Sequence, residues 1–490
     1  MPSGIEIGIR DGKITSLGYS LPRSQHTQVL NAQGAFVTPG GVDSHVHLAQ
    51  DDFGDGDGFD TGTKAAIAGG TTTVLSFATQ HREDTSLFPV LHDYHSRAED
   101  QAFCDYGFHF ILTNPTPSLV EYDLPLLVNR EGITSVKLYM TYERLQLRDR
   151  QILDIMMAAR QLGITTMIHA ENSDIISLIT ERLEARGRVE PFYHAIARPQ
   201  IAEAEATNRA IALAELMDAP ILLVHVSSES AMKLIRDAQT RLLPIHGETC
   251  PQYLLLLSER LQEPHFHGAK AVCSPPLRHE PHDLEAIWTG IANGTFTTLS
   301  SDHAPAKFDS PQGKTQGMKN GFPVFRNIPN GLPGVETRMP LMFNQAVGPH
   351  AKITLPRLVQ VTSTQPATLY GLSGVKGNIA PGYDADLVIW YPPRHRFEGI
   401  ETEGSGHLHI RADKLHHDCD YTPFEGMQLN NWPRYTILRG KIVWDRDHGG
   451  VVGQQGVGKF LKRKKGMVVM GRTGGSSVPG MMDGERNMWL

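Results

Sequence analysis

Two histidines, His45 and His47, end a short apolar run that follows a Pro-Gly-Gly turn. On a β-strand, side chains two residues apart point to the same face, so both imidazole rings would project together. Two imidazoles on one face of a strand end can bind a metal ion. Taken alone, the pair is also compatible with two surface histidines beside a turn.

Four further residues of metal-ligand or acid–base type lie in later apolar runs. Lys137 stands within Ser-Val-Lys-Leu-Tyr, whereas His169, His225 and Asp302 each end such a run. Any one of them alone can be a hydrogen-bonded core residue, but the repetition predicts a metal centre. Four histidines and an aspartate suit a borderline ion such as Zn²⁺, with positions left open for water. Lys137 is the exception, because an ammonium group would repel a divalent cation.

The elements that must position these residues are the strands of a parallel sheet. The middle of the chain alternates strand-like runs with helical patterns, among them Arg150–Gly163, where Gly163 is the expected C-cap, and Ala202–Met217. The eight expected strands are Gly41–His47, Thr72–Phe77, Tyr106–Leu112, Ser135–Tyr139, Thr165–His169, Ile221–Val226, Leu243–Gly247 and Thr297–Ser301. The simplest closure is an α/β fold of the (β/α)8 TIM-like barrel type, with its active site at the C-terminal strand ends. A doubly wound open sheet is the alternative, but no Gly-x-Gly-x-x-Gly follows the first strand.

Short alternating runs at both ends of the chain predict a small β-sandwich domain built from the two termini. Hairpin signatures surround Asp11-Gly12 and Arg439-Gly440. The expected division is residues 1–38 with 380–448 for the β domain, 39–379 for the barrel and 449–490 for a tail. Within the tail, the basic run 460–466 is expected to be solvated, and residues 471–490 are expected to be flexible or to contact another subunit.

The turn-rich segment 303–335 is expected to lack regular elements and to shape the site as a long loop.

The composition is that of an ordinary globular protein, with 40% hydrophobic and 20% charged residues and a net charge of −7. It gives no indication of a nucleic-acid or membrane partner. Four cysteines without a C-x-x-C pair indicate neither a disulfide framework nor a cysteine zinc site. Because no signal sequence or run of eighteen apolar residues is visible, we expect a cytoplasmic protein.

The set of candidate ligands resembles that of the binuclear amidohydrolase superfamily. The short sequence motifs around these ligands resemble those of the dihydropyrimidinases and D-hydantoinases within it. The matching stretches run in order along nearly the whole chain. They include Pro39–His47, Val136–Tyr142, His169–Asn172, Cys273–Arg278 and Ile328–Gly331.

This resemblance implies a site with two Zn²⁺ ions and a carbamylated lysine. Lys137 would react with CO₂ to give N6-carboxylysine. This modification replaces the repelling ammonium group with an anionic ligand that bridges both metals. The implied metal ligands are His45, His47, Lys137, His169, His225 and Asp302. Tyr142 corresponds to the tyrosine that hydrogen-bonds the tetrahedral oxyanion. Ser274 and Asn330 correspond to positions whose backbone groups hold the substrate ring, and the implied assembly is a homotetramer.

The implied reaction opens a cyclic amide, a 5,6-dihydropyrimidine or a hydantoin, to an N-carbamoyl amino acid. Asp302 would take the proton of the attacking water and return it to the leaving nitrogen. The alternatives are an allantoinase or another cyclic-imide hydrolase, and a dihydropyrimidinase-like scaffold without activity. A dihydroorotase is disfavoured, because Ala49 stands where those enzymes carry an arginine. We expect the acidic, Gly-rich loop at residues 48–60 to determine the substrate specificity.

Other clusters have competing explanations. His416-His-Asp-Cys419 lies beyond the barrel and is expected to be structural. His169-Ala-Glu171 resembles a deaminase motif, but no Pro-Cys-x-x-Cys follows it. His246 and Glu248 on the seventh strand are expected to support ligands or to pack. For His303, the sequence is equally compatible with a structural and a functional role.

Overall fold

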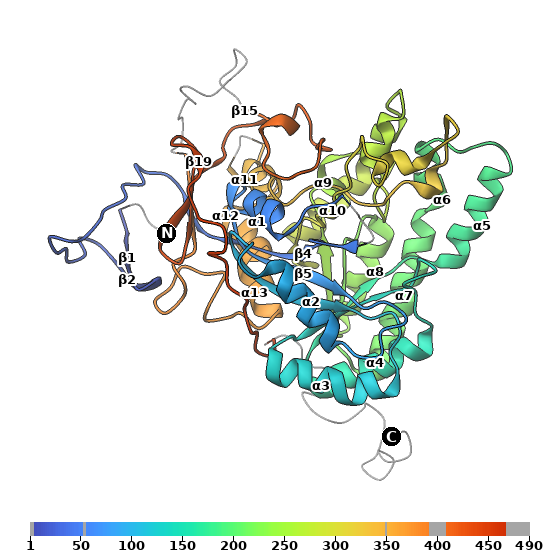
Figure 1. The fold of residues 1–490 in the computed structure, drawn as a ribbon, viewed down its shortest axis with the longest axis horizontal. Helices are drawn as coiled ribbons and strands as arrows, with labels where there is room; N and C mark the ends of the chain where they lie inside the picture. Colours follow the sequence, from blue (N-terminus) through green and yellow to red (C-terminus); the bar gives the residue numbers. More distant parts are fainter. Residues whose placement is uncertain (1–3, 52–54, 348–349, 392–407, 467–490) are drawn as a thin grey trace, which may run out of the picture.

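Eight parallel strands form the central sheet of the computed structural model, which describes residues 4–51, 55–347, 350–391 and 408–466 (Figure 1). They pair in chain order and are β4 (Gly41–Val46), β5 (Thr71–Thr79), β6 (Asp105–Ile111), β7 (Ser135–Tyr139), β8 (Thr165–His169), β9 (Ile221–Leu223), β10 (Ile245–Thr249) and β11 (Phe296–Leu299). The sheet closes where the amide of His47 donates to the carbonyl of His303 at 2.7 Å. The predicted barrel is confirmed.

The strands begin and end within a few residues of the predicted positions, and two differences have a clear cause. β9 ends at Leu223 and not at Val226, because His225 has a φ of 40°, which no extended strand can accommodate. β10 begins at Ile245 and not at Leu243, because Pro244 has no N–H to contribute to a ladder of hydrogen bonds.

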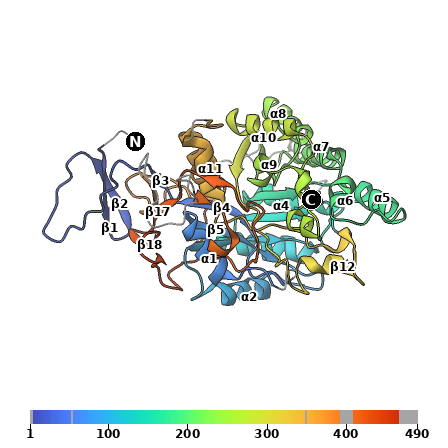
Figure 2. The same cartoon turned by 90° about the horizontal axis from the view of Figure 1, so that it is seen from above.

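The helices surround the strands, as a barrel requires (Figures 1 and 2). They are α1 (Phe59–Ala68), α2 (Phe88–Ala98), α3 (Leu124–Leu126), α4 (Asp149–Leu162), α5 (Ser173–Glu184), α6 (Phe192–Ala197), α7 (Gln200–Met217), α8 (Glu229–Thr240), α9 (Gln252–Leu255), α10 (Pro281–Ala292), α11 (Arg338–Val347), α12 (Leu355–Val359) and α13 (Gln365–Leu369). In α4, Ile152, Ile155, Met156 and Ala159 are buried, the spacing of a single apolar face. Gly163 caps this helix in the left-handed region, as predicted.

A small β domain combines both ends of the chain. Its five-stranded sheet has the order β19 (Gly450–Val451), β18 (Lys441–Asp445), β17 (Pro433–Leu438), β14 (Leu387–Trp390) and β3 (Val37–Pro39). The hairpin of β1 (Glu6–Arg10) and β2 (Lys13–Gly18) packs Ile14 against Leu387 and Ile437 of that sheet. Figure 2 shows this domain at the opposite end of the molecule from α5 and α6. The predicted domain is confirmed, whereas its expected boundaries at residues 38, 379 and 448 stay a prediction.

The prediction that residues 460–466 form a solvated basic run is wrong at Arg463. The backbone of this segment pairs with the start of the barrel strands, since the amide of Leu461 donates to the carbonyl of Tyr106 at 2.7 Å. The Arg463 guanidinium is buried and donates to Ser135 Oγ at 2.9 Å and to the Phe108 carbonyl. The segment therefore covers the N-terminal end of the barrel. Residues 471–490, expected to be flexible or to contact a subunit, lie outside the described residues.

The segment 303–335, expected to lack regular elements, contains short ones. They are the two-residue strands β12 (Met318–Lys319) and β13 (Phe322–Pro323) and two helical turns, η6 (Lys314–Gly317) and η7 (Phe325–Asn327). A second short ladder, β15 (Leu408–His409) with β16 (Gln428–Leu429), lies farther along the chain. Across the described ranges, no helix has the length and apolar character needed to cross a membrane.

Candidate active site

The end of β4 and the segment after β11 bring three predicted ligands together. His45 Nε2 lies 3.1 Å from Asp302 Oδ1, and His47 Nε2 lies 3.7 Å from the same oxygen. These three buried side chains offer ligand atoms that all lie within 4.8 Å of one another. On the far side of the ring, His45 Nδ1 donates to Glu248 Oε1 of β10 at 2.6 Å. Glu248 therefore fixes the ring so that Nε2 points to Asp302.

Lys137, in the middle of β7, reaches the same cluster. Its side chain is fully buried, and its Nζ lies 3.2 Å from His45 Nε2. The rings of Phe77 and Tyr139 lie 4.9 and 5.1 Å from the amine. Burial lowers the pKa of Lys137 to about 8. A sizeable fraction of the amine is therefore neutral near physiological pH.

The ends of β8 and β9 supply the two remaining histidines. The ring centroids of His169 and His225 lie 4.4 Å apart, and those of His225 and His45 lie 5.5 Å apart. His169 Nε2 bonds Glu171 Oε2 at 2.8 Å, which leaves Nδ1 for another partner. His225 Nδ1 is buried and has no hydrogen-bond partner among the described residues. Both rings thus retain a nitrogen that a metal ion can use.

The charges in the cluster suit metal binding. Burial lowers the pKa of His47, His169 and His225 well below its ordinary value, so these rings are neutral, as metal ligands must be. Burial also lowers the pKa of His45, but Glu248 and Asp302 outweigh it and raise the pKa above the ordinary value. Burial acts to raise the pKa of Asp302, yet the histidines around it hold that pKa below its usual range.

The donor set therefore fits a divalent cation. It offers neutral imidazole nitrogens and an ionised carboxylate, which are the ligands of borderline metals. Glu248 and Glu171 each hold the far nitrogen of a histidine ring, the arrangement that orients metal-bound histidines in proteins. Within the part of the chain that the structure describes, His45, His47 and Asp302 form a group of three ligand-type side chains that could hold a metal ion.

The predicted substrate-binding residues lie at the edge of this cluster. The Tyr142 ring lies 5.4 Å from the His169 ring, and its hydroxyl accepts a hydrogen bond from Asn330 Nδ2 at 3.1 Å. Ser274 is a second hydrogen-bond partner of that hydroxyl. Ser274 Oγ also lies 3.3 Å from His194 Nε2 on α6. Three separate loops thus meet beside the candidate metal ligands.

Four residues at or near the candidate site have a strained backbone. Ala49, Tyr142, His225 and Asp302 all have φ between 40° and 67°, in the left-handed region that non-glycine residues avoid. Each such residue costs on the order of 1–3 kcal/mol, and such strain tends to gather at functional sites. The strain supports a functional role for these strand ends.

Comparison with known proteins decides the family. Residues 36–443 match the model of the amidohydrolase family. The chain belongs to this family. D-hydantoinase of Ralstonia pickettii is 39% identical to it over 466 residues, which cover 94% of this chain and 96% of that protein. D-hydantoinase of Geobacillus stearothermophilus is 39% identical over 463 residues, which cover 93% and 92%. The crystal structure of dihydropyrimidinase from Brevibacillus agri is 37% identical, with a TM-score of 0.86 over 94% of this chain and 95% of that one.

The predicted relationship to the dihydropyrimidinases and D-hydantoinases is thereby confirmed, and so is the enzyme class, a cyclic amidohydrolase. The fold of this amidohydrolase brings all nine predicted site residues to one end of the barrel. The role of each residue stays a prediction.

Sequence reasoning missed a charged pair behind the site of this amidohydrolase. Arg198 Nη1 donates to Glu171 Oε2 at 2.7 Å, and its guanidinium carbon lies 5.2 Å from the centre of the Tyr142 ring. In the sequence, Glu171 stood out only as part of a deaminase-like motif. In the structure, its carboxylate bonds His169 Nε2 and orients that ring. Arg198 lies directly after α6 and ends no apolar run, so no signal in the sequence marks it.

His303, which sequence reasoning left open, has a structural role in this amidohydrolase. Its Nε2 donates to Asp57 Oδ2 at 3.1 Å, and its Nδ1 accepts from the amide of Gly334 at 3.1 Å. Asp57 also accepts from the amide of Asp418 at 2.7 Å. His303 and Asp57 thus connect the loop after His47 to the His416–Cys419 segment, whose expected structural role stays a prediction. Residues 52–54 of that loop lie outside the described residues.

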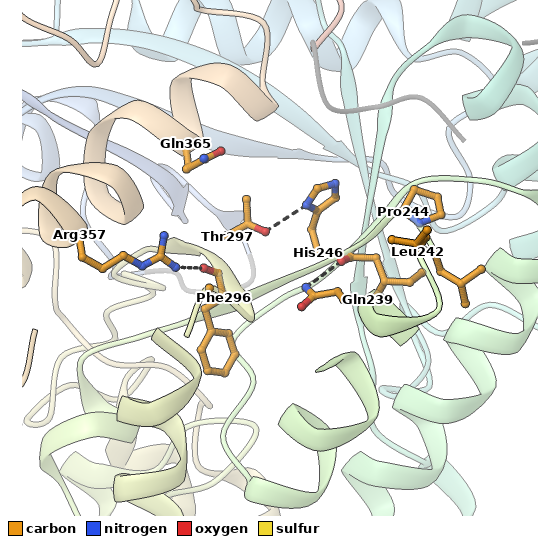
Figure 3. A pocket seen from close by; sticks show the side chains of 11 residues that line it. Gln239, Leu242, Pro244, His246, Phe296, Thr297, Arg357 and Gln365 are labelled. Atoms are coloured by element: carbon orange, nitrogen blue, oxygen red, sulfur yellow. Dashed lines mark hydrogen bonds between the residues drawn. The ribbon is translucent and has the colours of Figure 1, made fainter. Parts of the chain in front are cut away.

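A cavity of about 460 Å³ opens at the other end of the barrel, beside the starts of β10 and β11 (Figure 3). His246 Nδ1 bonds Thr297 Oγ1 at 3.0 Å there, and Arg357 donates to the Phe296 carbonyl at 2.7 Å. These polar groups satisfy one another, and the cavity lies at the N-terminal end of the barrel, away from the candidate ligands. It is not the active site.

Proposed function

We propose that this chain hydrolyses the ring amide of hydantoins and 5,6-dihydropyrimidines to N-carbamoyl amino acids. The observation that carries the proposal is the convergence of six ligand-type side chains with Tyr142 and Asn330 at the C-terminal end of the barrel. Relatives named D-hydantoinase and dihydropyrimidinase, which match over nearly the whole chain, support it.

The proposed cofactor is a pair of Zn²⁺ ions. The residues that would hold it are His45, His47, Lys137, His169, His225 and Asp302. When bound, the ions would lower the pKa of a water molecule and polarise the ring carbonyl. Lys137 would join them as a carbamate, formed when its neutral amine attacks CO₂ and releases a proton. Its lowered pKa and its position beside His45 Nε2 favour that step.

Asp302 is the proposed proton carrier. Because the surrounding histidines keep its carboxylate ionised, it can take the proton of the attacking water. It would then return that proton to the ring nitrogen, which becomes the NH2 of the carbamoyl group when the amide bond breaks. The left-handed backbone at Asp302 holds the carboxylate at the end of the barrel, where both partners would lie.

Tyr142 is the proposed oxyanion donor. Burial raises the pKa of its hydroxyl, so the group keeps its proton at neutral pH. A donor aimed at the developing negative charge stabilises the transition state by about 3 kcal/mol. The bond from Asn330 Nδ2 fixes the hydroxyl beside His169.

Turnover of three substrates tests this function. The protein reconstituted with Zn²⁺ in bicarbonate should hydrolyse hydantoin and dihydrouracil faster than allantoin. Allantoin as the best substrate would instead favour the allantoinase alternative. Less than one bound metal per chain, together with no turnover, would favour the non-catalytic scaffold.

A homotetrameric, cytoplasmic enzyme is part of the same proposal; the family resemblance implies the homotetramer, and the sequence led us to expect the cytoplasm. Light scattering coupled to size-exclusion chromatography measures the assembly, and a monomer would contradict that part.

A further inference from the structure

Lys314, the first residue of η6, is a fully buried lysine whose amine contacts only the backbone in its described hydrogen bonds. Its Nζ donates to the carbonyl oxygens of Val272 at 2.9 Å, Pro329 at 2.6 Å and Gly331 at 2.7 Å. An ammonium group has three donors, so these bonds use all of them. The lysine thus joins two loops in the way that a small bound cation does.

The three carbonyls belong to the loops that carry the proposed substrate contacts. Pro329 and Gly331 flank Asn330 on either side, and Val272 precedes Ser274 by two residues. The amide of Gly331 also donates to the Val272 carbonyl at 3.1 Å. Lys314 is therefore at the junction between the Ser274 loop and the Asn330 loop.

This junction fixes the direction of the backbone at Asn330. The carbonyls of Pro329 and Gly331 both point to one atom, Lys314 Nζ. The Asn330 side chain reaches Tyr142. The backbone at Asn330 is thus held in one orientation beside the active-site tyrosine.

A merely structural role explains this lysine poorly. Burying an amine is costly, and an apolar side chain of similar volume would fill the same space without that cost. Burial lowers the pKa of Lys314 to about 7. The titratable groups near it are the thiols of Cys273 and Cys419, which burial keeps neutral by raising their pKa, and the imidazole of His194, whose pKa burial lowers to about 3. What the amine contributes is the fixed orientation of three carbonyls.

We infer that Lys314 is a positioning residue, which orients the backbone groups of Ser274 and Asn330 that hold the substrate ring. It acts on substrate affinity more than on the chemical step. The inference rests on the proposed cyclic-amide hydrolysis.

The test compares Lys314→Met with a matched control, Lys376→Met. Lys376 is another fully buried lysine, but its Nζ bonds Asp105 at 2.6 Å and Asp386 at 2.7 Å, away from the active site. We expect Lys314→Met to raise KM for hydantoin about tenfold, the effect of losing one or two hydrogen bonds. The zinc content should stay at the wild-type level, and kcat should change by less than about threefold. Lys376→Met should lower Tm without changing KM.

An unchanged KM in Lys314→Met would overturn the inference. If that variant does not fold, Lys314→Ala prepared with propylammonium chloride replaces it, because this ion has the four heavy atoms that the substitution removes. KM should then fall as the concentration of added amine rises. A KM that does not change with the amine concentration would also overturn the inference. If the wild type does not hydrolyse hydantoin, the proposed function fails separately. KM is then compared on whichever cyclic amide or imide the wild type opens.

Discussion

Glu248→Gln should weaken zinc binding although Glu248 is not itself a predicted ligand. Its carboxylate accepts from His45 Nδ1 at 2.6 Å, and both side chains are fully inaccessible to solvent. Glutamine keeps the size of the side chain and an acceptor oxygen but removes the charge. His45 then loses a charged partner that both orients its ring and raises its pKa.

The expected magnitude follows from the kind of hydrogen bond that is lost. A hydrogen bond to a charged acceptor contributes about 1.5–3 kcal/mol, and a neutral one contributes about 1 kcal/mol. The difference of about 0.5–2 kcal/mol corresponds to a Kd weaker by roughly 2–30-fold. Loss of a carboxylate behind a metal-bound histidine typically weakens affinity by about 10–100-fold. We therefore expect at least about a tenfold loss.

The assay is competition for Zn²⁺ with a chromophoric chelator, and the matched control is Glu336→Gln. Glu336 is a buried carboxylate that bonds His416 Nδ1 at 2.9 Å, outside the candidate site. Both variants should lose stability, but only Glu248→Gln should lose zinc affinity. Equal zinc affinities in the two variants would refute the role assigned to Glu248.

Three further predictions concern catalysis, activation and stability. Tyr142→Phe should lower kcat about 100-fold with unchanged zinc content, because it removes one oxyanion donor; a kcat within about threefold of wild type would contradict this role. At constant dissolved CO₂, the rate of reactivation of metal-free enzyme should rise from pH 6 and level off above the Lys137 pKa of about 8, since only the neutral amine attacks CO₂. A rate that is independent of pH would exclude Lys137 as the group that reacts. Arg463→Met should lower the urea-derived free energy of unfolding by about 1–3 kcal/mol, because Ser135 Oγ and the Phe108 carbonyl lose their donor; KM should not change.

The barrel could be predicted because buried parallel strands appear in the sequence as apolar runs, several of which end at or near a predicted ligand. β7 and β8 have the predicted bounds, and they place Lys137 and His169 as expected. The strands deviate where a local backbone property intervenes, at His225 with its positive φ and at Pro244 without an N–H. Periodicity contains no information on either effect.

The supporting residues could not be predicted, because their roles depend on contacts between distant segments. Arg198, directly after α6, contacts Glu171, directly after β8, only in the folded protein. In the sequence, Lys314 is only a lysine in a turn-rich loop. Its role depends on the carbonyls of the Asn330 loop, which accept hydrogen bonds from its amine in the folded protein. Arg463 belongs to a basic run that looks solvated, and only the folded barrel presents a buried hydroxyl and carbonyl to it.

The central proposal is that Lys137, as a carbamate, would help to hold two metal ions, and the zinc stoichiometry of wild type and Lys137→Ala tests it most directly. After reconstitution in bicarbonate, the wild type should bind two Zn²⁺ per chain and hydrolyse hydantoin. Lys137→Ala should bind at most one ion and have no detectable turnover. Two ions and full turnover in Lys137→Ala would contradict the account.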